Sequence, residues 1–132
     1  MVTRLRRTAL ATALLFSTTW AFGADFDGSR ALICATVDAH ECDPGEVCLR
    51  GLPDDVGAPR FLRVDFTAKT IAGPKRTTQI RYLDTSAEQV LMQGTELGYA
   101  WTIALDKTDG SMSMTFVNRE DTFVVFGYCT PP

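Results

Sequence analysis

From residue 60 onward, the chain consists of short segments in which apolar and polar residues alternate, separated by turn residues. This alternation matches the two-residue repeat of a half-buried β-strand, and closely spaced short strands are typical of an antiparallel meander. The clearest hairpin joins segments 100–105 and 111–116 through a turn at 106–110. About seven strands are predicted. Because closure removes exposed sheet edges, we expect an all-β fold: a small antiparallel barrel or a strongly curved meander.

The first 23 residues have the pattern of a secretory signal peptide. Three arginines precede an apolar stretch at residues 9–20, and small residues follow around position 23. The apolar stretch is shorter than the roughly 20 residues that a membrane-spanning helix needs. We therefore expect a periplasmic or secreted protein with one domain over residues 24–132 and no stable membrane insertion after cleavage.

Cleavage after residue 23 would remove Arg4, Arg6 and Arg7 and change the formal net charge from −3 to −6. A nucleic-acid partner is then not expected, because phosphate binding relies on a basic stripe that the remaining chain lacks. Positive charge is concentrated near the first predicted strands of the meander, which could orient an anionic ligand or partner. These positions are Arg60, Arg63, Arg76 and Arg81.

Four cysteines lie in the exported part, and an even number in an oxidising compartment predicts two disulfides. The preferred pairing joins Cys42 to Cys48 around a turn and Cys34 to Cys129 between the chain ends. Zinc is not expected, because the spacing lacks a second close pair of ligands and His40 is the only histidine. No metal or other cofactor is predicted.

Residues 24–59 are harder to assign. Segment 31–42 fits either a strand or a short N-terminal helix capped by Ser29, and a short helical turn is slightly favoured. Residues 52–59 contain two prolines and one glycine, which favour an irregular surface loop.

No complete catalytic motif is present, so we expect a protein that is not an enzyme. His40 is interpreted as exposed or structural, since its neighbour Glu41 would point to the opposite face of a strand. The paired carboxylates at 54–55 and 120–121 are expected to be solvated turn residues, because glycosidase carboxylates face each other across a cleft. The chain has no Gly-x-Ser-x-Gly nucleophile motif.

Aromatic residues are the remaining candidates for a site. Tyr99 and Trp101 share one strand face with Ile103, and other aromatic residues occupy nearby strands. These are Phe116, Phe123, Phe126 and Tyr128. An interior filled by these side chains is the expectation, and a cavity that they line, as in a calycin-like barrel, is the alternative.

Four segments carry a resemblance to known proteins: 32–36, 41–48, 59–66 and 123–130. They resemble small exported bacterial proteins described as uncharacterised, which implies no activity. In size, export, β content and a terminal cysteine, the layout is also similar to the periplasmic inhibitors of C-type lysozyme. That family inserts a Ser-Gly loop with a nearby Tyr into the enzyme. The corresponding residues here, 85–88, contain neither Gly nor Tyr, so no inhibitory residue is transferred.

The resulting hypothesis is an exported binding or interaction module that binds or inhibits an envelope protein through loops 84–88 and 94–99. The alternative is a calycin-like barrel that binds a small apolar ligand near Trp101. The predicted binding residues are Ser86, Tyr99 and Trp101.

Overall fold

A computed structural model describes residues 25–132, which form a curled antiparallel β-sheet with one short 3₁₀ helix, η1 (Pro53–Val56). The strands are β1 (Leu32–Cys42), β2 (Leu49–Gly51), β3 (Phe61–Asp65), β4 (Thr70–Ala72), β5 (Thr77–Gln79), β6 (Tyr82–Thr85), β7 (Gln89–Glu96), β8 (Tyr99–Asp106), β9 (Ser111–Val117) and β10 (Thr122–Thr130). Within residues 25–132, no helix is long and apolar enough to span a membrane. The expected signal peptide lies outside the described residues.

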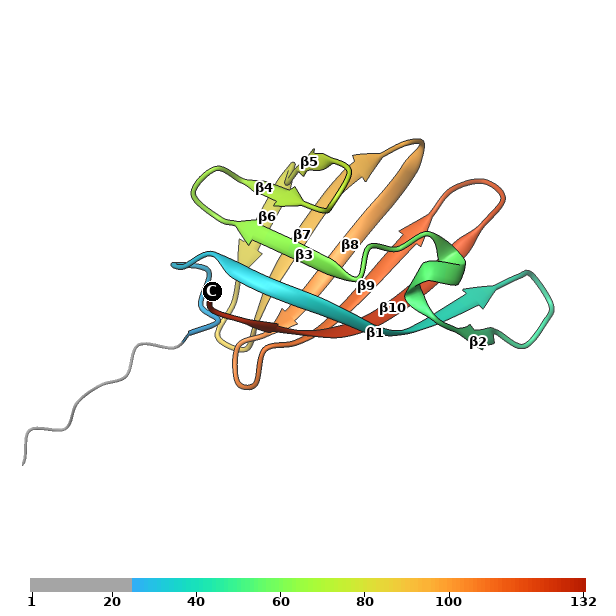
Figure 1. The fold of residues 1–132 in the computed structure, drawn as a ribbon, viewed down its shortest axis with the longest axis horizontal. Helices are drawn as coiled ribbons and strands as arrows, with labels where there is room; N and C mark the ends of the chain where they lie inside the picture. Colours follow the sequence, from blue (N-terminus) through green and yellow to red (C-terminus); the bar gives the residue numbers. More distant parts are fainter. Residues whose placement is uncertain (1–24) are drawn as a thin grey trace, which may run out of the picture.

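The strands follow the order β5-β4-β3-β1-β10-β9-β8-β7-β6, and β2 pairs with the far end of β1. The two ends of this path are consecutive in the chain, because only Ile80 and Arg81 separate β5 from β6. The Ile80 N–H donates to the Lys69 carbonyl and the Arg81 N–H donates to the Gln93 carbonyl, both at 2.8 Å. This link therefore bonds to both ends of the sheet and curls it into a barrel-like shape (Figure 1).

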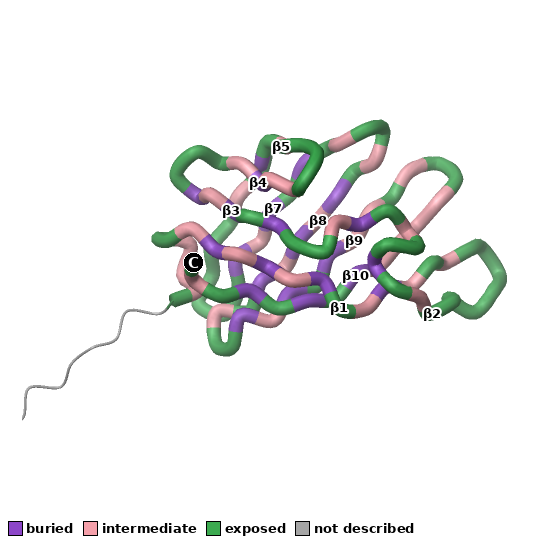
Figure 2. Tube along the Cα trace, in the orientation of Figure 1, coloured by how far each residue is buried: buried purple, intermediate pink, exposed green. Residues whose placement is uncertain are grey.

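The core lies inside the curl, and buried positions alternate with more exposed ones along the long strands, as the colours of Figure 2 show. In β7 and β8 the inward positions include Val90, Met92, Ile103 and Leu105, which are almost completely buried. Phe26 packs against this core near the β8–β9 turn, where a side chain on Gly110 would collide with its ring. One end of the barrel is therefore covered by the segment that precedes β1.

Both disulfides have the expected partners. Cys34 and Cys129 are direct register partners on β1 and β10, so this bond links the strands that join the two halves of the sheet. The Cys42–Cys48 bond closes the turn between β1 and β2. Residues 39–51, which comprise the end of β1, this turn and β2, are called the β1–β2 arm below. The arm extends beyond the barrel at the right of Figure 1.

The slight preference for a helical turn within residues 31–42 is wrong, because residues 32–42 form the eleven-residue strand β1. Partners on both sides explain this outcome. β10 pairs along nearly all of β1, while β3 and β2 pair along its other edge. Backbone hydrogen bonds to two neighbouring strands outweigh a weak local helix preference. Residues 52–59, expected as an irregular surface loop, include η1 and the buried residues Pro53 and Ala58.

The all-β class and the strongly curved antiparallel sheet are confirmed, and residues 25–132 contain ten strands in place of about seven. Part of the difference comes from residues 77–85, which form two short strands, β5 and β6, on either side of Ile80, because the chain there leaves β4 and joins β7. β2 is a three-residue strand whose pattern is too short to recognise in the sequence.

Removing the Cys34–Cys129 bond should destabilise the barrel more than removing the Cys42–Cys48 bond. In the chain-entropy model, the long loop closed by the first contributes about 4 to 5 kcal/mol and the short loop closed by the second about 2 kcal/mol. We expect the Cys34→Ala/Cys129→Ala variant to show the larger loss of unfolding free energy in denaturant titrations. The Cys42→Ala/Cys48→Ala variant is the matched control, and equal losses would contradict the prediction.

Candidate ligand cavity

A cavity of about 980 Å³ opens at the end of the barrel opposite Phe26. Its mouth is formed by η1 with the residues that follow it, the β4–β5 loop at 73–76, and the β7–β8 turn. These segments lie at the same end because the strands that they connect alternate in direction. This end is on the right of Figure 1, away from the chain termini of the barrel.

The inner wall of the cavity is apolar and comes from five strands. Trp101 and Ile103 on β8 face the cavity beside Phe116 and Met114 on β9, their direct register partners. The remaining inner residues are Leu62 on β3, Ile71 on β4 and Phe123 on β10. The same two-residue alternation that buries the core thus presents a continuous hydrocarbon and aromatic surface to the cavity.

Charged residues surround the mouth, and most of the cations there have acidic partners. Arg60 Nε donates to Asp54 Oδ2 at 2.8 Å, and this hydrogen bond lowers the pKa of Asp54 below its usual value. Arg76 lies 3.9 Å from Glu96 across the gap between the β4–β5 loop and β7. The third cation, Lys75, lies next to Arg76 in the loop.

Trp101 is the most deeply buried aromatic residue of the cavity wall, with 3% of its surface exposed. Its indole ring lies against Gly94, the register partner on β7, at a place where any side chain on Gly94 would overlap the ring. The indole Nε1–H is buried and has no hydrogen-bond acceptor among the described residues. Tryptophan usually finds an acceptor when it is buried, so this donor is exceptional.

The structure brings two of the three predicted binding residues together. Tyr99 and Trp101 both line the cavity. Ser86 lies beyond the other end of β7, where its hydroxyl accepts hydrogen bonds from the Glu88 and Gln89 backbone N–H groups of the β6–β7 turn. The two loops predicted to act together, 84–88 and 94–99, are separated by the length of β7, which is about 25 Å for eight residues.

The aromatic residues divide between the two faces of the barrel wall. Phe116 and Phe123 line the cavity, whereas Phe126 and Tyr128 occupy the outward positions of β10 and are exposed. The sequence did not identify Leu62, Ile71 or Met114 as cavity residues, although their alternation placed them on one strand face. Whether an inward residue meets another side chain or open space depends on the curvature of the sheet.

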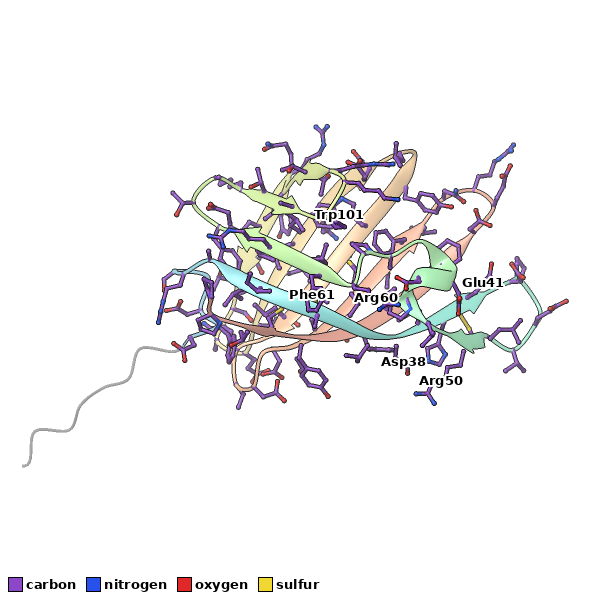
Figure 3. The ribbon with its side chains drawn as sticks, viewed as in Figure 1. Asp38, Glu41, Arg50, Arg60, Phe61 and Trp101 are labelled. Carbon is purple, nitrogen blue, oxygen red and sulfur yellow. A yellow bond between two sulfur atoms is a disulfide. The ribbon has the colours of Figure 1, made fainter. Side chains whose placement is uncertain are left out.

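The potential acid–base residues do not form one cluster: the acidic pair at 54–55 lines the cavity mouth, whereas His40 is not among the lining residues. His40 lies on the outer face, 3.6 Å from Asp38, which also accepts a hydrogen bond from Arg50 at 2.9 Å. Figure 3 shows Asp38 and Arg50 near the β1–β2 arm, well away from Trp101. Of the adjacent carboxylates at 54–55, Asp54 pairs with Arg60 and Asp55 accepts the Leu52 backbone N–H at 2.8 Å.

Among residues 25–132, no group of three or more histidine, cysteine or acidic side chains is arranged to hold a metal ion. No protein-family model, curated protein or solved structure matches this chain. By its fold and its cavity, the described part of the chain is a small β-barrel-like domain with one open end, where an apolar inner wall lies behind a mouth lined by charged residues.

The turn between β9 and β10 is fastened to β8 by Tyr99, whose hydroxyl donates to Asp121 at 2.9 Å. This hydrogen bond, together with partial burial, raises the pKa of Tyr99 above its ordinary value. Because this pKa is higher in the folded state, the hydrogen bond contributes its full stabilisation of the fold at a pH below the pKa of the unfolded phenol. That contribution disappears as the pH rises through the pKa of Tyr99 in the folded protein.

We therefore expect Tyr99 to give a late-titrating component, above the ordinary pKa of tyrosine, in an ultraviolet phenolate titration. The variant Tyr99→Phe should lose the late-titrating component, while Tyr82→Phe, at an exposed position, should retain it. The loss of the late component in both variants, or in neither, would contradict the assignment.

Proposed function

We propose that this domain is a binding protein that takes a small apolar ligand into the open end of its barrel. The observation that carries the proposal is the cavity of about 980 Å³ with an apolar inner wall. Ligand sites are typically concave, mainly apolar and about 300 to 1,000 Å³ in volume, with a few polar groups that orient the ligand. The apolar surface of a ligand leaves water on entry, which favours binding by about 25 cal/mol per Å².

The arrangement of the barrel supports this role. The covered end near Phe26 is packed, whereas loops surround the open end. Two of the three cations at the mouth already face a carboxylate, in the pairs Arg60–Asp54 and Arg76–Glu96, which lowers the cost of withdrawing them from water when an apolar molecule enters.

We also propose that the protein works in the periplasm or outside the cell after cleavage of residues 1–23. Two disulfides with no free cysteine among residues 25–132 suit an oxidising compartment. Cleavage would leave Trp101 as the only tryptophan, since Trp20 lies in the leader. Fluorescence of the mature protein would then report on the cavity wall alone.

Filling the cavity should abolish ligand binding. We expect Met114→Trp, which adds bulk inside the cavity, to remove the fluorescence enhancement of the neutral apolar probe N-phenyl-1-naphthylamine seen with the unmodified protein. Thr102→Trp adds the same side chain on the outer face of β8 and should retain the enhancement, because its neighbours there are Gln93 and Thr115. Circular dichroism and thermal melting check the fold of both variants.

If Met114→Trp fails to fold, Phe116→Trp offers a smaller increase in volume at the same wall. No enhancement with the unmodified protein would contradict the proposal, as would equal enhancement with folded cavity-filled and control variants.

A second function, binding to an envelope protein, is favoured by the β1–β2 arm. Val47 and Leu49 are 87% and 68% exposed beside the Cys42–Cys48 bond, and apolar side chains presented on a constrained loop are typical of interaction sites. Glu41, Asp43 and Glu46 give the arm an acidic character that would suit a basic partner. Loops 84–88 and 94–99, which the sequence suggested as a joint binding surface, lie at opposite ends of β7 and cannot form one surface. We therefore propose that docking uses the arm.

The variant Val47→Ser/Leu49→Ser should weaken binding to such a partner at least tenfold, and Val37→Ser/Val117→Ser, which also removes exposed valines, should not. The partner would be identified from an envelope extract, purified, and titrated against each variant by calorimetry. Retention of no basic protein, or equal affinity for the two variants, would contradict docking through the arm.

A further inference from the structure

We propose that the outer face of the barrel binds an acidic polysaccharide, whose sugar rings stack on Phe61 and Tyr128 while its carboxylates reach Arg63. This site lies outside the cavity and does not depend on the proposed ligand. Its basis is an exposed aromatic surface beside a concentration of positive charge.

Three exposed aromatic side chains lie close together on the outer face. They are called the aromatic platform below and are Phe61, Phe126 and Tyr128, with exposed fractions of 62%, 40% and 60%. Ala35 on β1 is the direct register partner of both Phe61 on β3 and Tyr128 on β10. Two strand spacings therefore separate Phe61 from Tyr128, which is about 10 Å. Phe126 lies two residues before Tyr128, on the same face of β10.

The neighbours of the platform are small or polar. On β9, Ser113 and Ser111 are the register partners of Phe126 and Tyr128, and both are serines. His40 contacts Phe126 edge-on, with the ring centroids 5.9 Å apart, which restrains that ring. Outward aromatic side chains add nothing to the core inside the curl, and clustered exposed apolar residues mark interaction sites.

The part of the chain that carries Phe61 is strongly basic. Residues 60–81, called the basic segment below, contain six lysines and arginines and one acidic residue, Asp65. The basic segment thus has a net charge of +5, although residues 24–132 as a whole carry −6. Four of its cations form no ion pair with another residue of 25–132: Arg63, Lys69, Lys75 and Arg81.

Arg63 connects this charge with the platform. It lies two residues after Phe61 on the same exposed face of β3. Its register partners are Ile33 on β1 and Ala72 on β4, and neither carries a charge. The nearby Asp65 carboxylate accepts the Ala68 backbone N–H at 2.8 Å. Because a guanidinium binds a carboxylate through two parallel hydrogen bonds, Arg63 suits an acidic group held beside Phe61.

An acidic polysaccharide combines the two requirements of this surface. The negative face of an aromatic ring attracts polarised C–H groups, and a pyranose ring presents such groups on one side. An extended sugar chain that crosses β3, β1 and β10 can stack on Phe61 and Tyr128 in turn. The serine hydroxyls of β9 can then bond to its hydroxyl groups, and its carboxylates complement the basic segment.

Charge disfavours two other occupants of the platform. A two-fold dimer through this face would bring two copies of the platform, each with its Arg63, against each other, and like charges repel. An anionic membrane is an extended surface that would also repel the acidic remainder of the molecule. A single polysaccharide chain contacts only the platform and the basic segment beside it.

The test measures the affinity of the unmodified protein for oligogalacturonate, a chain of sugars that each carry a carboxylate, by calorimetry. Dextran oligosaccharides supply sugar rings without charge, and polyglutamate supplies carboxylates without sugar rings. We expect oligogalacturonate to bind about tenfold more tightly than either control. Its affinity should fall as salt is added, because salt screens exposed charges.

Phe61→Leu/Tyr128→Leu keeps apolar side chains on the platform but removes the rings, and should weaken oligogalacturonate binding about tenfold. Tyr82→Leu removes a tyrosine that is 51% exposed on β6 and should leave the affinity unchanged. Arg63→Gln should weaken binding and reduce its salt dependence, whereas Arg119→Gln, in the β9–β10 turn, should do neither. Circular dichroism checks the fold of each variant.

No binding of oligogalacturonate, or equal binding of either control, would overturn the proposal. Unchanged affinity of the double leucine variant would overturn it as well, because apolar area without rings would then suffice. Binding to anionic vesicles, or dimerisation in sedimentation, that is lost in Phe61→Ser/Tyr128→Ser would assign the platform to a lipid surface or to a second copy instead. None of these outcomes bears on the cavity, which the naphthylamine probe tests separately.

Discussion

The pairing of β1 with β10 is the constraint on which the remaining structure depends. Every other major pairing joins strands that are close in the sequence, whereas this one brings residues 33–42 against residues 122–130. Closing so long a loop has an entropic cost that local hairpins do not face. The inward positions Cys34 and Cys129 occupy this seam as direct partners, so the covalent bond lies where the closure cost is greatest.

The same seam determines the shape of the open end. The register of β1 against β10 shifts between Thr36 and Asp38, and such a bulge bends a strand and increases its twist. Gly127 permits the close approach there, because any side chain would overlap the Ala35 carbonyl. Just before the bulge, the Thr36 hydroxyl and N–H donate to the Pro59 and Arg60 carbonyls at 2.8 and 3.0 Å, which fixes the segment that carries Arg60 to the mouth.

Much of the fold was predictable because the information is local. In residues 89–130, alternation indicates three long strands and a continuous apolar run indicates a fourth, and the cysteine positions suggested the two disulfides that the structure contains. β1 was ambiguous because its alternation is compatible with a short helix until the partner strands are known. The cavity was only the alternative to a filled interior for a different reason: Trp101 and Phe116 were assigned to the interior, but alternation does not report how much space separates opposite walls. Residues 52–59 resembled a loop, and only their position at the barrel end gives η1 a part in the mouth.

The space inside the barrel depends on where its largest side chain lies. Toward the covered end, Val90, Met92, Leu105 and Met112 fill the interior from neighbouring strands. Toward the open end, the inward position of β7 is Gly94, so the indole of Trp101 lies against the wall in place of projecting across the interior. A side chain at position 94 would displace the ring into the cavity. Gly94 and Trp101 thus act as a pair that preserves the volume of the cavity and leaves one buried N–H without a partner.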